Sequence, residues 1–515
     1  MWVDLTSLKM RLDVIRSMFL PIFLALACIV SAPAFAFGID DVTEMARALA
    51  AKPFEAPREN LPAELRDITY DQYRDIRFRN EKSLWQSANL PFEIRFFHAG
   101  LNFRHPVRIN EVEPAGVTPV RFDSRDFHYG KNTFDTSKFA DAGFAGFRVH
   151  YPINNQEYKD EVAVFAGASY FRAVGKGQRY GLSARGLAVD AGEDTGEEIP
   201  AFREFWLERP AANAKHLVVY ALLDSRRVTG AYRFSIHPGE ETYMDVHANI
   251  FQREKGAKLG IAPLTSMFYF AENQPAPSHE YRPEVHDSDG LLVQTEHGEW
   301  IWRPLVNPNR LWVSSFGAHN PRGFGLMQRD RDFRNYQDLE ARYELRPSAW
   351  ITPKGDWKHG RVELELLPTP NEINDNIVAY WVPRELAELG QATSFEYRLS
   401  WQHDKIAEPP HSKVVQSRAG HGFRTHADDS LLFMIDFEGA ALKKLKPDAE
   451  VKGQVWVGDT GELIEHQVFR NDATGGWRVS LRMRRKTSQP VEIRAGLRSA
   501  GKDISETWSY LLLPP

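Results

Sequence analysis

The stretch Phe92-Glu93-Ile94-Arg95-Phe96 places apolar side chains at every second position, with a charged side chain between them. Successive side chains of a β-strand point to opposite faces, so this alternation predicts a half-buried strand. The same period recurs at 163–166, 216–220, 233–236 and 362–366, with Pro and Gly between the segments. The sequence therefore predicts an all-β fold whose larger part is an N-terminal β-sandwich. The clearest helix expected is 40–51, and 61–66 predicts a shorter one.

A change of composition after Trp401 predicts a second structural unit. Residues 402–422 are polar, contain Pro409-Pro410 and lack a sustained apolar pattern. Short strand-like segments then recur at 431–437, 451–457, 466–470, 477–483, 491–497 and 507–513. We expect a large sandwich over 37–403, a linker leading into the second unit over 404–422, and a small immunoglobulin-like β-sandwich over 423–515.

Composition excludes several classes of protein. The chain has 515 residues, of which 43% are hydrophobic and 26% charged, so general disorder is excluded and more than one core is expected. The net charge is −5, and no block of like charges gives the electrostatic footprint of nucleic-acid binding. A neutral polymer or a small molecule fits this balance better than an acidic partner.

The N-terminus has the pattern of a secretory signal peptide over residues 1–36. Lys9, Arg11 and Arg16 precede an apolar run over 18–30, and Ala34-Phe35-Ala36 matches a cleavage site. The run is short for a membrane span, so we expect no stable membrane insertion after cleavage. A lipoprotein signal around Cys28, the only cysteine, is the alternative. Export without disulfides favours a bacterial periplasm.

Polar and aromatic residues concentrate between His286 and Asp375. Within this stretch, Trp302 and Arg303, with Tyr343, Arg346 and Trp350, could line a sugar-binding groove, because aromatic faces stack on sugar C–H surfaces. Aromatic residues in a β-sandwich are nevertheless more often part of the core. The run from Arg329 to Asp332 alternates in charge and predicts a salt-linked structural segment.

Three aspartates in this stretch are candidates for acid–base chemistry. Asp287 and Asp289 stand two positions apart, so on a strand they would face the same side, and repulsion would raise one pKa. An Asp-rich turn or a calcium loop is the alternative, although no bidentate Glu follows at the required spacing. Asp375 lies between two asparagines just before an apolar strand, where it could face a cleft or belong to an ordinary turn.

No cofactor or metal site is expected. The loop 175–181 differs from a dinucleotide-binding loop in the place of its third Gly and has no βαβ pattern around it. The group His237, Glu240, Glu241 and His247 lacks helical metal-ligand spacing, so a surface position is the better interpretation.

Long strings of the sequence resemble the family of the periplasmic glucans biosynthesis proteins G and D (OpgG and OpgD). These strings are Ser169-Tyr170-Phe171-Arg172-Ala173-Val174, Ser183-Ala184-Arg185-Gly186-Leu187, Pro200-Ala201-Phe202, Val285-His286-Asp287-Ser288-Asp289-Gly290, Pro321-Arg322-Gly323-Phe324-Gly325-Leu326, Arg346-Pro347-Ser348 and Asn374-Asp375-Asn376-Ile377-Val378-Ala379. The resemblance spans essentially the whole mature chain. It implies a large β-sandwich joined to a small immunoglobulin-like domain.

The resemblance also implies a role in making osmoregulated periplasmic glucans, whose backbone is β-1,2-linked glucose, and similarity to inverting β-1,2-glucan hydrolases. Matched by motif, Asp375 takes the place of the general acid and Asp287 that of the base. Tyr343, Arg346 and Glu372 would lie near the substrate. The expected partner is β-1,2-glucan. In the alternative, a non-catalytic glucan-binding or branching factor assists the inner-membrane glucan glucosyltransferase, and a generic carbohydrate lectin is a third possibility.

Overall fold

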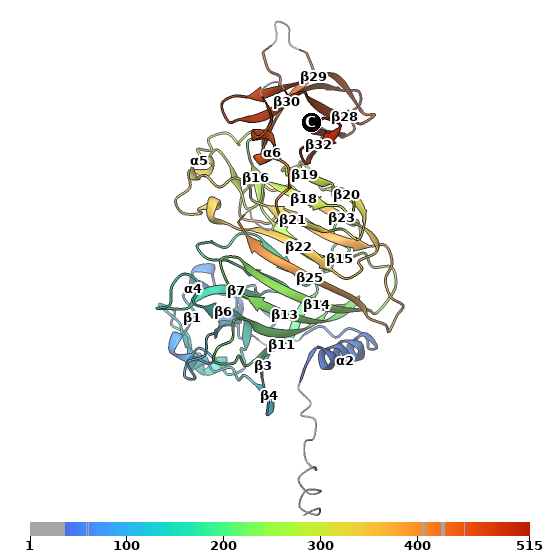
Figure 1. Cartoon of the computed structure of the whole chain (residues 1–515). Helices are drawn as coiled ribbons and strands as arrows, with labels where there is room; N and C mark the ends of the chain where they lie inside the picture. The colour runs from blue at the N-terminus through green and yellow to red at the C-terminus, as the bar shows by residue number, and fades with distance from the viewer. Residues whose placement is uncertain are drawn as a thin grey trace, which may run out of the picture.

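The computed structural model describes residues 37–514, apart from 58, 60, 404–406, 424–427 and 447–448. The predicted signal peptide and part of the predicted linker therefore lie outside the described residues. The regular structure of the described chain consists mostly of β-strands in stacked sheets, with one long helix at its start (Figure 1). This confirms the all-β fold with a large and a small sandwich.

In the described part of the chain, a ten-stranded sheet forms one layer of the large sandwich. Its neighbouring strands pair antiparallel. Burial alternates over 94–98, as the period-two pattern predicts, whereas 163–165 and 362–366 are buried at every residue, so these strands are covered on both faces. In spatial order its strands are β2 (Glu93–His98), β6 (Phe144–Tyr151), β7 (Asp160–Ala166), β8 (Tyr170–Ala173), β9 (Ser183–Arg185), β15 (Leu259–Ser266), β24 (Ile377–Pro383), β23 (His359–Leu366) and β20 (Trp312–His319), with β10 (Leu187–Val189) also on β15.

A fifteen-stranded sheet forms the second layer and extends into the C-terminal unit. Its strands in the large sandwich are β19 (Trp300–Pro304), β18 (Gly290–Gln294), β21 (Gly323–Met327), β22 (Ser348–Lys354), β25 (Thr393–Gln402), β14 (Thr242–Gln252), β13 (Val228–His237), β12 (Leu217–Asp224), β11 (Ala201–Glu208), β3 (Arg108–Glu113) and β4 (Gly116–Pro119). Phe165 of β7 packs against Phe234 of β13 with ring centroids 5.2 Å apart, which places the core between the layers.

The helix α2 (Ile39–Ala50) covers the outer face of the second sheet, and its position agrees with the predicted 40–51. Val42 and Ala46 are fully buried against Tyr220 and neighbouring apolar residues, so β12 is buried on both faces. The Thr229 hydroxyl donates to the Ala46 carbonyl at 2.8 Å and fixes the helix in place. Shorter helical segments are α3 (Ala63–Arg66), α4 (Tyr70–Arg74), α5 (Phe333–Tyr336) and α6 (Ala440–Lys443), with 3₁₀ turns at η1 (Asn80–Lys82), η2 (Ser124–Asp126), η3 (Thr136–Phe139) and η4 (Tyr343–Leu345).

The C-terminal unit is a small sandwich that shares one sheet with the large one. One layer consists of β26 (Lys413–Gly420), β27 (Leu431–Glu438), β30 (Gly476–Arg485) and β29 (Gly461–Asn471); the other consists of β28 (Val451–Val457), β31 (Val491–Ser499), β32 (Lys502–Asp503) and β33 (Thr507–Leu512). The strand β33 runs parallel to β19, pairing Thr507 with Ile301 and Trp508 with Trp302. Within the stretch 404–422, residues 413–420 form β26 and already pair with β27.

Two short pairs complete the described strands, namely β1 (Arg77–Phe78) with β5 (Phe127–His128), and β16 (Phe268–Phe270) with β17 (Val285–His286). The second pair matters for function, because β17 leads directly into Asp287, and β16 continues the chain from the end of β15. No helix among the described residues is long and apolar enough to cross a membrane.

Candidate active site

Asp287 and Asp375 are brought together by the end of one strand, β15. The Asp287 amide donates to the Met267 carbonyl at 2.8 Å, and the Asn376 amide donates to the Ser266 carbonyl at 3.0 Å. Consecutive carbonyls at this strand end therefore hold both the backbone of Asp287 and the residue after Asp375. Two segments far apart in the sequence therefore meet at the end of this strand.

Asn376 anchors the loop that presents Asp375. Its side chain is 1% exposed; its Oδ1 accepts from the Phe268 amide at 2.8 Å, and its Nδ2 donates to the Leu367 carbonyl at 3.0 Å. The Leu367 amide in turn donates to the Asn376 carbonyl at 2.8 Å, which closes the base of the loop between β23 and β24. Asp375 thus projects from a fixed point, and Asn376 serves as the anchor of the loop.

Asp375 reaches solvent but is surrounded by enough protein to shift its ionisation. Burial, followed by the charge of Asp287, raises the pKa of Asp375 from 3.8 to about 6. The positive charges of Arg172, Arg185 and Arg346 act in the opposite direction. Asp375 is nevertheless solvent-exposed, so its raised pKa is that of a carboxyl partly surrounded by protein and still open to water.

Asp287 is held in a different environment, with its side chain 5% exposed. Burial raises the pKa of Asp287, and an ion pair between its Oδ1 and the Arg346 Nη1 opposes that effect. The Arg346 guanidinium lies 4.2 Å from the centroid of the Tyr343 ring, a cation–π contact that fixes the arginine. The pair places one carboxylate oxygen on a cation and leaves the second oxygen of Asp287 available for another partner.

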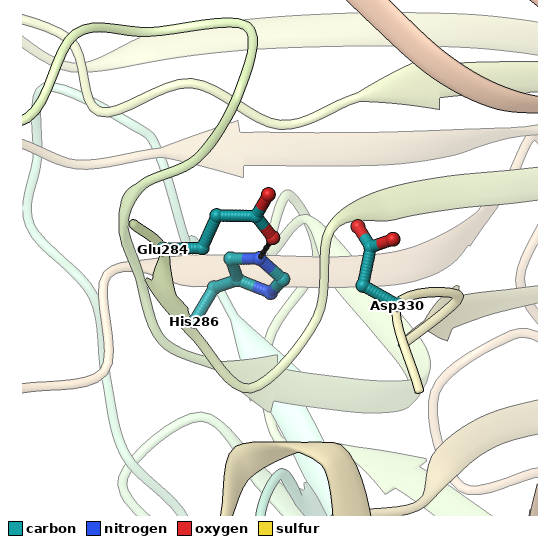
Figure 2. A group of neighbouring side chains, drawn as sticks. All are labelled: Glu284, His286 and Asp330. Carbon is teal, nitrogen blue, oxygen red and sulfur yellow. Dashed lines mark hydrogen bonds and ion pairs between the residues drawn. The ribbon is translucent and has the colours of Figure 1, made fainter. Parts of the chain in front are cut away.

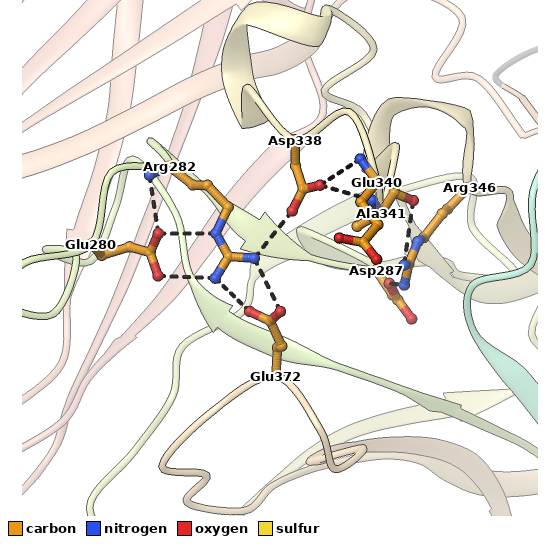
Figure 3. Close-up of polar contacts among 8 residues, drawn as sticks. All are labelled: Glu280, Arg282, Asp287, Asp338, Glu340, Ala341, Arg346 and Glu372. Atoms are coloured by element: carbon orange, nitrogen blue, oxygen red, sulfur yellow. Dashed lines mark hydrogen bonds and ion pairs between the residues drawn. The ribbon is translucent and has the colours of Figure 1, made fainter. Parts of the chain in front are cut away.

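A network of ion pairs joins the loops of the two aspartates (Figure 3). Arg282 binds Glu372 at 2.6 Å and Asp338 at 3.2 Å, and Glu372 belongs to the Asp375 loop. Asp338 accepts hydrogen bonds from the amides of Glu340 and Ala341. The Ala341 carbonyl accepts from Arg346, which pairs with Asp287. Tyr343, Arg346 and Glu372 therefore lie in one connected group with both aspartates.

Three residues missed by the sequence prediction line the same site. Arg172 and Arg185 lower the pKa of Asp375, and the charge of Asp375 raises that of Tyr170, so all three lie close to that carboxyl. Arg185 is buried and held by Glu197 at 2.5 Å. A cavity of about 470 Å³ opens beside Tyr170 and Glu197. Tyr170, Arg172 and Arg185 stood in strings that carried the resemblance, which was the available signal.

The structure does not bring Trp302, Arg303 or Trp350 into this group. Trp302 is 4% exposed and lies beneath Arg329, whose guanidinium is 3.6 Å from a ring centroid. Arg303 is buried and pairs at 2.5 Å with Glu492 in the C-terminal unit. Trp350 is 3% exposed and packs on Gly323, where a Cβ would approach its ring to 2.2 Å. Rings and a guanidinium this buried stabilise the sheet and the junction of the two units.

Asp289 also departs from the predicted arrangement. It follows Asp287 by two positions, but the segment between β17 and β18 is not a regular strand, and the two side chains have different neighbours. The Asp289 Oδ2 accepts from the Arg329 amide at 2.9 Å. Burial and the charge of Asp330 raise the pKa of Asp289 to about 6, whereas the charge of Asp287 acts on Asp375. The predicted repulsion between Asp287 and Asp289 is therefore not the main one: the charge of Asp287 acts on Asp375, and the charge of Asp330 acts on Asp289.

Comparison with known proteins gives a match over almost the whole described chain. The family model described as "Periplasmic glucan biosynthesis protein, MdoG" matches residues 37–512. A protein named glucans biosynthesis protein G from Ralstonia nicotianae is 56% identical over 490 residues, which cover 93% of this chain and 97% of the relative. Proteins of the same name from Pseudomonas paraeruginosa and Pectobacterium atrosepticum are 51% and 48% identical, covering 94% and 98% of each chain.

Proposed function

The chain belongs to the family of periplasmic glucan biosynthesis proteins, MdoG, and from that premise we propose that it cleaves β-1,2-glucan as an inverting endo-glucanase of the periplasm. Asp375 would act as the general acid and Asp287 as the general base. The proposal includes export by the N-terminal signal over residues 1–36, with removal of that segment.

The raised pKa of Asp375, caused by burial and by the nearby charge of Asp287, is the observation that carries the proposal. A general acid must hold a proton near the working pH, and a pKa of about 6 leaves a useful protonated fraction where an ordinary Asp would have almost none. The cause is burial together with the nearby charge of Asp287, the pattern that separates the roles of two carboxyl groups in glycosidases.

Burial raises the pKa of Asp287, and the ion pair with Arg346 opposes that rise by favouring the ionised carboxylate, the form that the role of base requires. In the proposed step, Asp287 removes a proton from water as the water oxygen attacks the anomeric carbon. The bond from that carbon to the glycosidic oxygen breaks, and Asp375 donates its proton to the departing oxygen. One water is consumed, and inversion at the anomeric carbon follows from attack on the face opposite the leaving group.

The surroundings of Asp375 suit a sugar polymer. Tyr170 offers an aromatic face, and Arg172 is an exposed cation with five donors for hydroxyl oxygens. A cavity of about 470 Å³ begins at Tyr170 and is lined by aromatic and charged residues, including Phe103 and Arg203; its lining includes neither of the two proposed catalytic aspartates, so it would hold a part of the polymer away from the cleaved bond. Hydroxyl-rich substrates are recognised by this combination of ring faces and charged hydrogen-bonding groups.

The test is to digest linear β-1,2-glucan with the purified protein and to follow chain length and the anomeric form of the first product by NMR. We expect shorter chains with an inverted anomeric centre. Asp375→Asn and Asp287→Asn should each lower kcat by about 10²- to 10⁴-fold. Asp245→Asn, at a surface ion pair on β14, is the matched control and should keep its activity. Full turnover by Asp375→Asn would refute the assignment.

One observation favours a non-catalytic glucan-binding or branching factor as the second candidate. Asp287 is already engaged by Arg346, and a carboxylate held by a guanidinium can serve as a hydrogen-bond acceptor for sugar hydroxyls. Under that function the digestion assay gives no shorter chains. The glucan would instead bind without being cleaved, and Asp287→Asn would weaken that binding.

A further inference from the structure

A second polar cluster includes His286, the residue that immediately precedes Asp287. Glu284 and His286 belong to the segment of β17, and Asp330 follows β21 (Figure 2). The His286 ring nitrogen and one carboxylate oxygen each from Glu284 and Asp330 lie within 4.8 Å of one another. His286 is fully buried, between the rings of Phe268 and Tyr336.

The hydrogen bonds of Gln328 fix which nitrogen of His286 faces the cluster. The Gln328 Nε2 donates to the His286 carbonyl at 2.9 Å and to the Tyr343 carbonyl at 3.3 Å, so its Oε1 must be the atom 2.8 Å from the His286 Nδ1. Nδ1 therefore carries a hydrogen, and Nε2 faces the Glu284 carboxylate 3.2 Å away, where a bound cation would be shared by the nitrogen and the carboxylate. A carbonyl holding the other ring nitrogen is what metal-binding histidines have.

Asp289 supplies an independent observation that points to a ligand. Its side chain is 8% exposed, and its Oδ2 accepts from the amides of Arg329 and Asp330, at 2.9 Å and 3.3 Å. Its Oδ1 is buried and has no hydrogen-bond partner. Asp289 and Asp330 both line a cavity of about 20 Å³, enough for one water-sized particle. A buried carboxylate oxygen without a donor is costly, and a bound cation would satisfy it.

The local charge balance also favours a cation. The carboxyl groups of Glu272, Glu284, Asp289 and Asp330 gather in this region. Two arginines oppose this negative charge: Arg329, which is itself bound through both terminal nitrogens to Glu506, lowers the pKa of Asp289 and Asp330, and Arg418 lowers that of Glu284. Buried carboxylates are stable when they are paired or coordinate a metal.

We propose that Glu284, His286 and Asp330 bind one divalent transition-metal cation, of the class of Zn²⁺ or Mn²⁺, with Asp289 as a further oxygen ligand. One imidazole nitrogen among carboxylate oxygens suits these ions, whereas Ca²⁺ and Mg²⁺ prefer oxygen ligands throughout. Zinc ligands at about 2.1 Å in a tetrahedron are about 3.4 Å apart, so the side chains would close in by roughly an ångström.

The cation would act as a positioning element for the proposed catalytic base. His286 immediately precedes Asp287, and Asp330 immediately follows Arg329, which binds Glu506 of the C-terminal unit. A metal bound between them would tie β17, the segment after β21 and the C-terminal unit to one point. This goes beyond the proposed hydrolysis, because the cation contacts neither Asp375 nor the Asp287 carboxylate.

The test uses the full chain, treated with chelator and then titrated with Zn²⁺ by calorimetry. We expect one saturable site, release of protons counted by repeating the titration in buffers of different ionisation enthalpy, and a rise in the thermal unfolding midpoint with added Zn²⁺. His286→Gln, Glu284→Gln and Asp330→Asn should each weaken binding at least tenfold. The matched controls His150→Gln, Glu93→Gln and Asp245→Asn, at ionisable side chains elsewhere, should bind as the wild type does.

Co²⁺ gives a second measurement that needs no variant. Bound to the wild type, it should show visible absorption bands of nitrogen and oxygen coordination, and Zn²⁺ should displace them. Absence of saturable binding by the wild type would overturn the proposal and leave the cluster as a store of shared protons. Tenfold weaker binding in the controls, or unchanged binding in folded site variants, would overturn the assignment of ligands. The glucan digestion assay reports on Asp375 separately from all of these outcomes.

Discussion

Replacing Asn376 by Ala should damage activity more than the loss of one amide side chain suggests. The substitution leaves the Phe268 amide without its acceptor at 2.8 Å and the Leu367 carbonyl without its donor at 3.0 Å, both in a place where Asn376 is 1% exposed. Each unsatisfied buried group costs about 1–3 kcal/mol, so we expect a loss of about 2–6 kcal/mol in the free energy of unfolding.

The effect on catalysis follows from the loop that Asn376 closes. Its amide and side chain define where Asp375 stands relative to Asp287, and a displacement of about 1 Å in a reacting group costs on the order of 100-fold in rate. Glucan digestion should therefore show a fall in kcat of that order, measured at a temperature where the variant remains folded. Urea titration gives the stability change on the same preparation.

Asn371→Ala is the matched control in the same loop. The Asn371 side chain accepts only from the Ile373 amide, at 3.0 Å, in an exposed turn, so the cost should stay below about 1 kcal/mol and activity should be retained. Equal losses in the two variants would show that any change in the loop disturbs catalysis. An Asn376→Ala variant with wild-type kcat and stability would refute the reasoning about the anchor.

Three further predictions concern charge. Arg172→Met removes a cation that lowers the pKa of Asp375, so the alkaline limb of the kcat/KM profile should move to higher pH. Asp375→Asn should stabilise the fold at pH 8, because the carboxyl has its pKa raised to about 6 and its ionised form opposes folding; the gain should fade toward pH 4, as denaturant titrations at several pH values would show. Arg329→Met breaks a buried ion pair to the C-terminal unit and should cost about 3–5 kcal/mol, whereas Arg334→Met, at an exposed pair, should cost less than about 1 kcal/mol in the same titration.

Local pattern predicted the elements of this fold well. The segment 451–457 is β28 as expected, and 40–51 differs from α2 by one residue at each end. Periodicity reports which face of a segment is buried, and that information is local. The parallel pairing of β33 with β19 could not be predicted in this way, because it joins segments with no common local signal.

The site was predictable only in part. Neither Asp287 nor Asp375 carries a local sign that the two meet, because their contact depends on carbonyls at the end of β15. The resemblance to a family supplied that pairing. The sequence also suggested binding residues that the structure places elsewhere, namely Trp302, Arg303 and Trp350. An aromatic residue beside an arginine gives the same sequence pattern in a binding groove and at a buried junction. Burial, which decides between them, is a property of the folded chain.

The parallel ladder between β33 and β19 makes the chain's final strand a structural part of the large sandwich. A protein ending near residue 403 would expose the backbone donors and acceptors of β19 as an open edge, the feature through which unrelated chains stick together. Synthesis from the N-terminus delivers residues 507–512 about a hundred residues after the rest of the large sandwich, so the β19 edge stays unpaired until they emerge. The large sandwich should therefore complete its folding only once the C-terminal unit has been made.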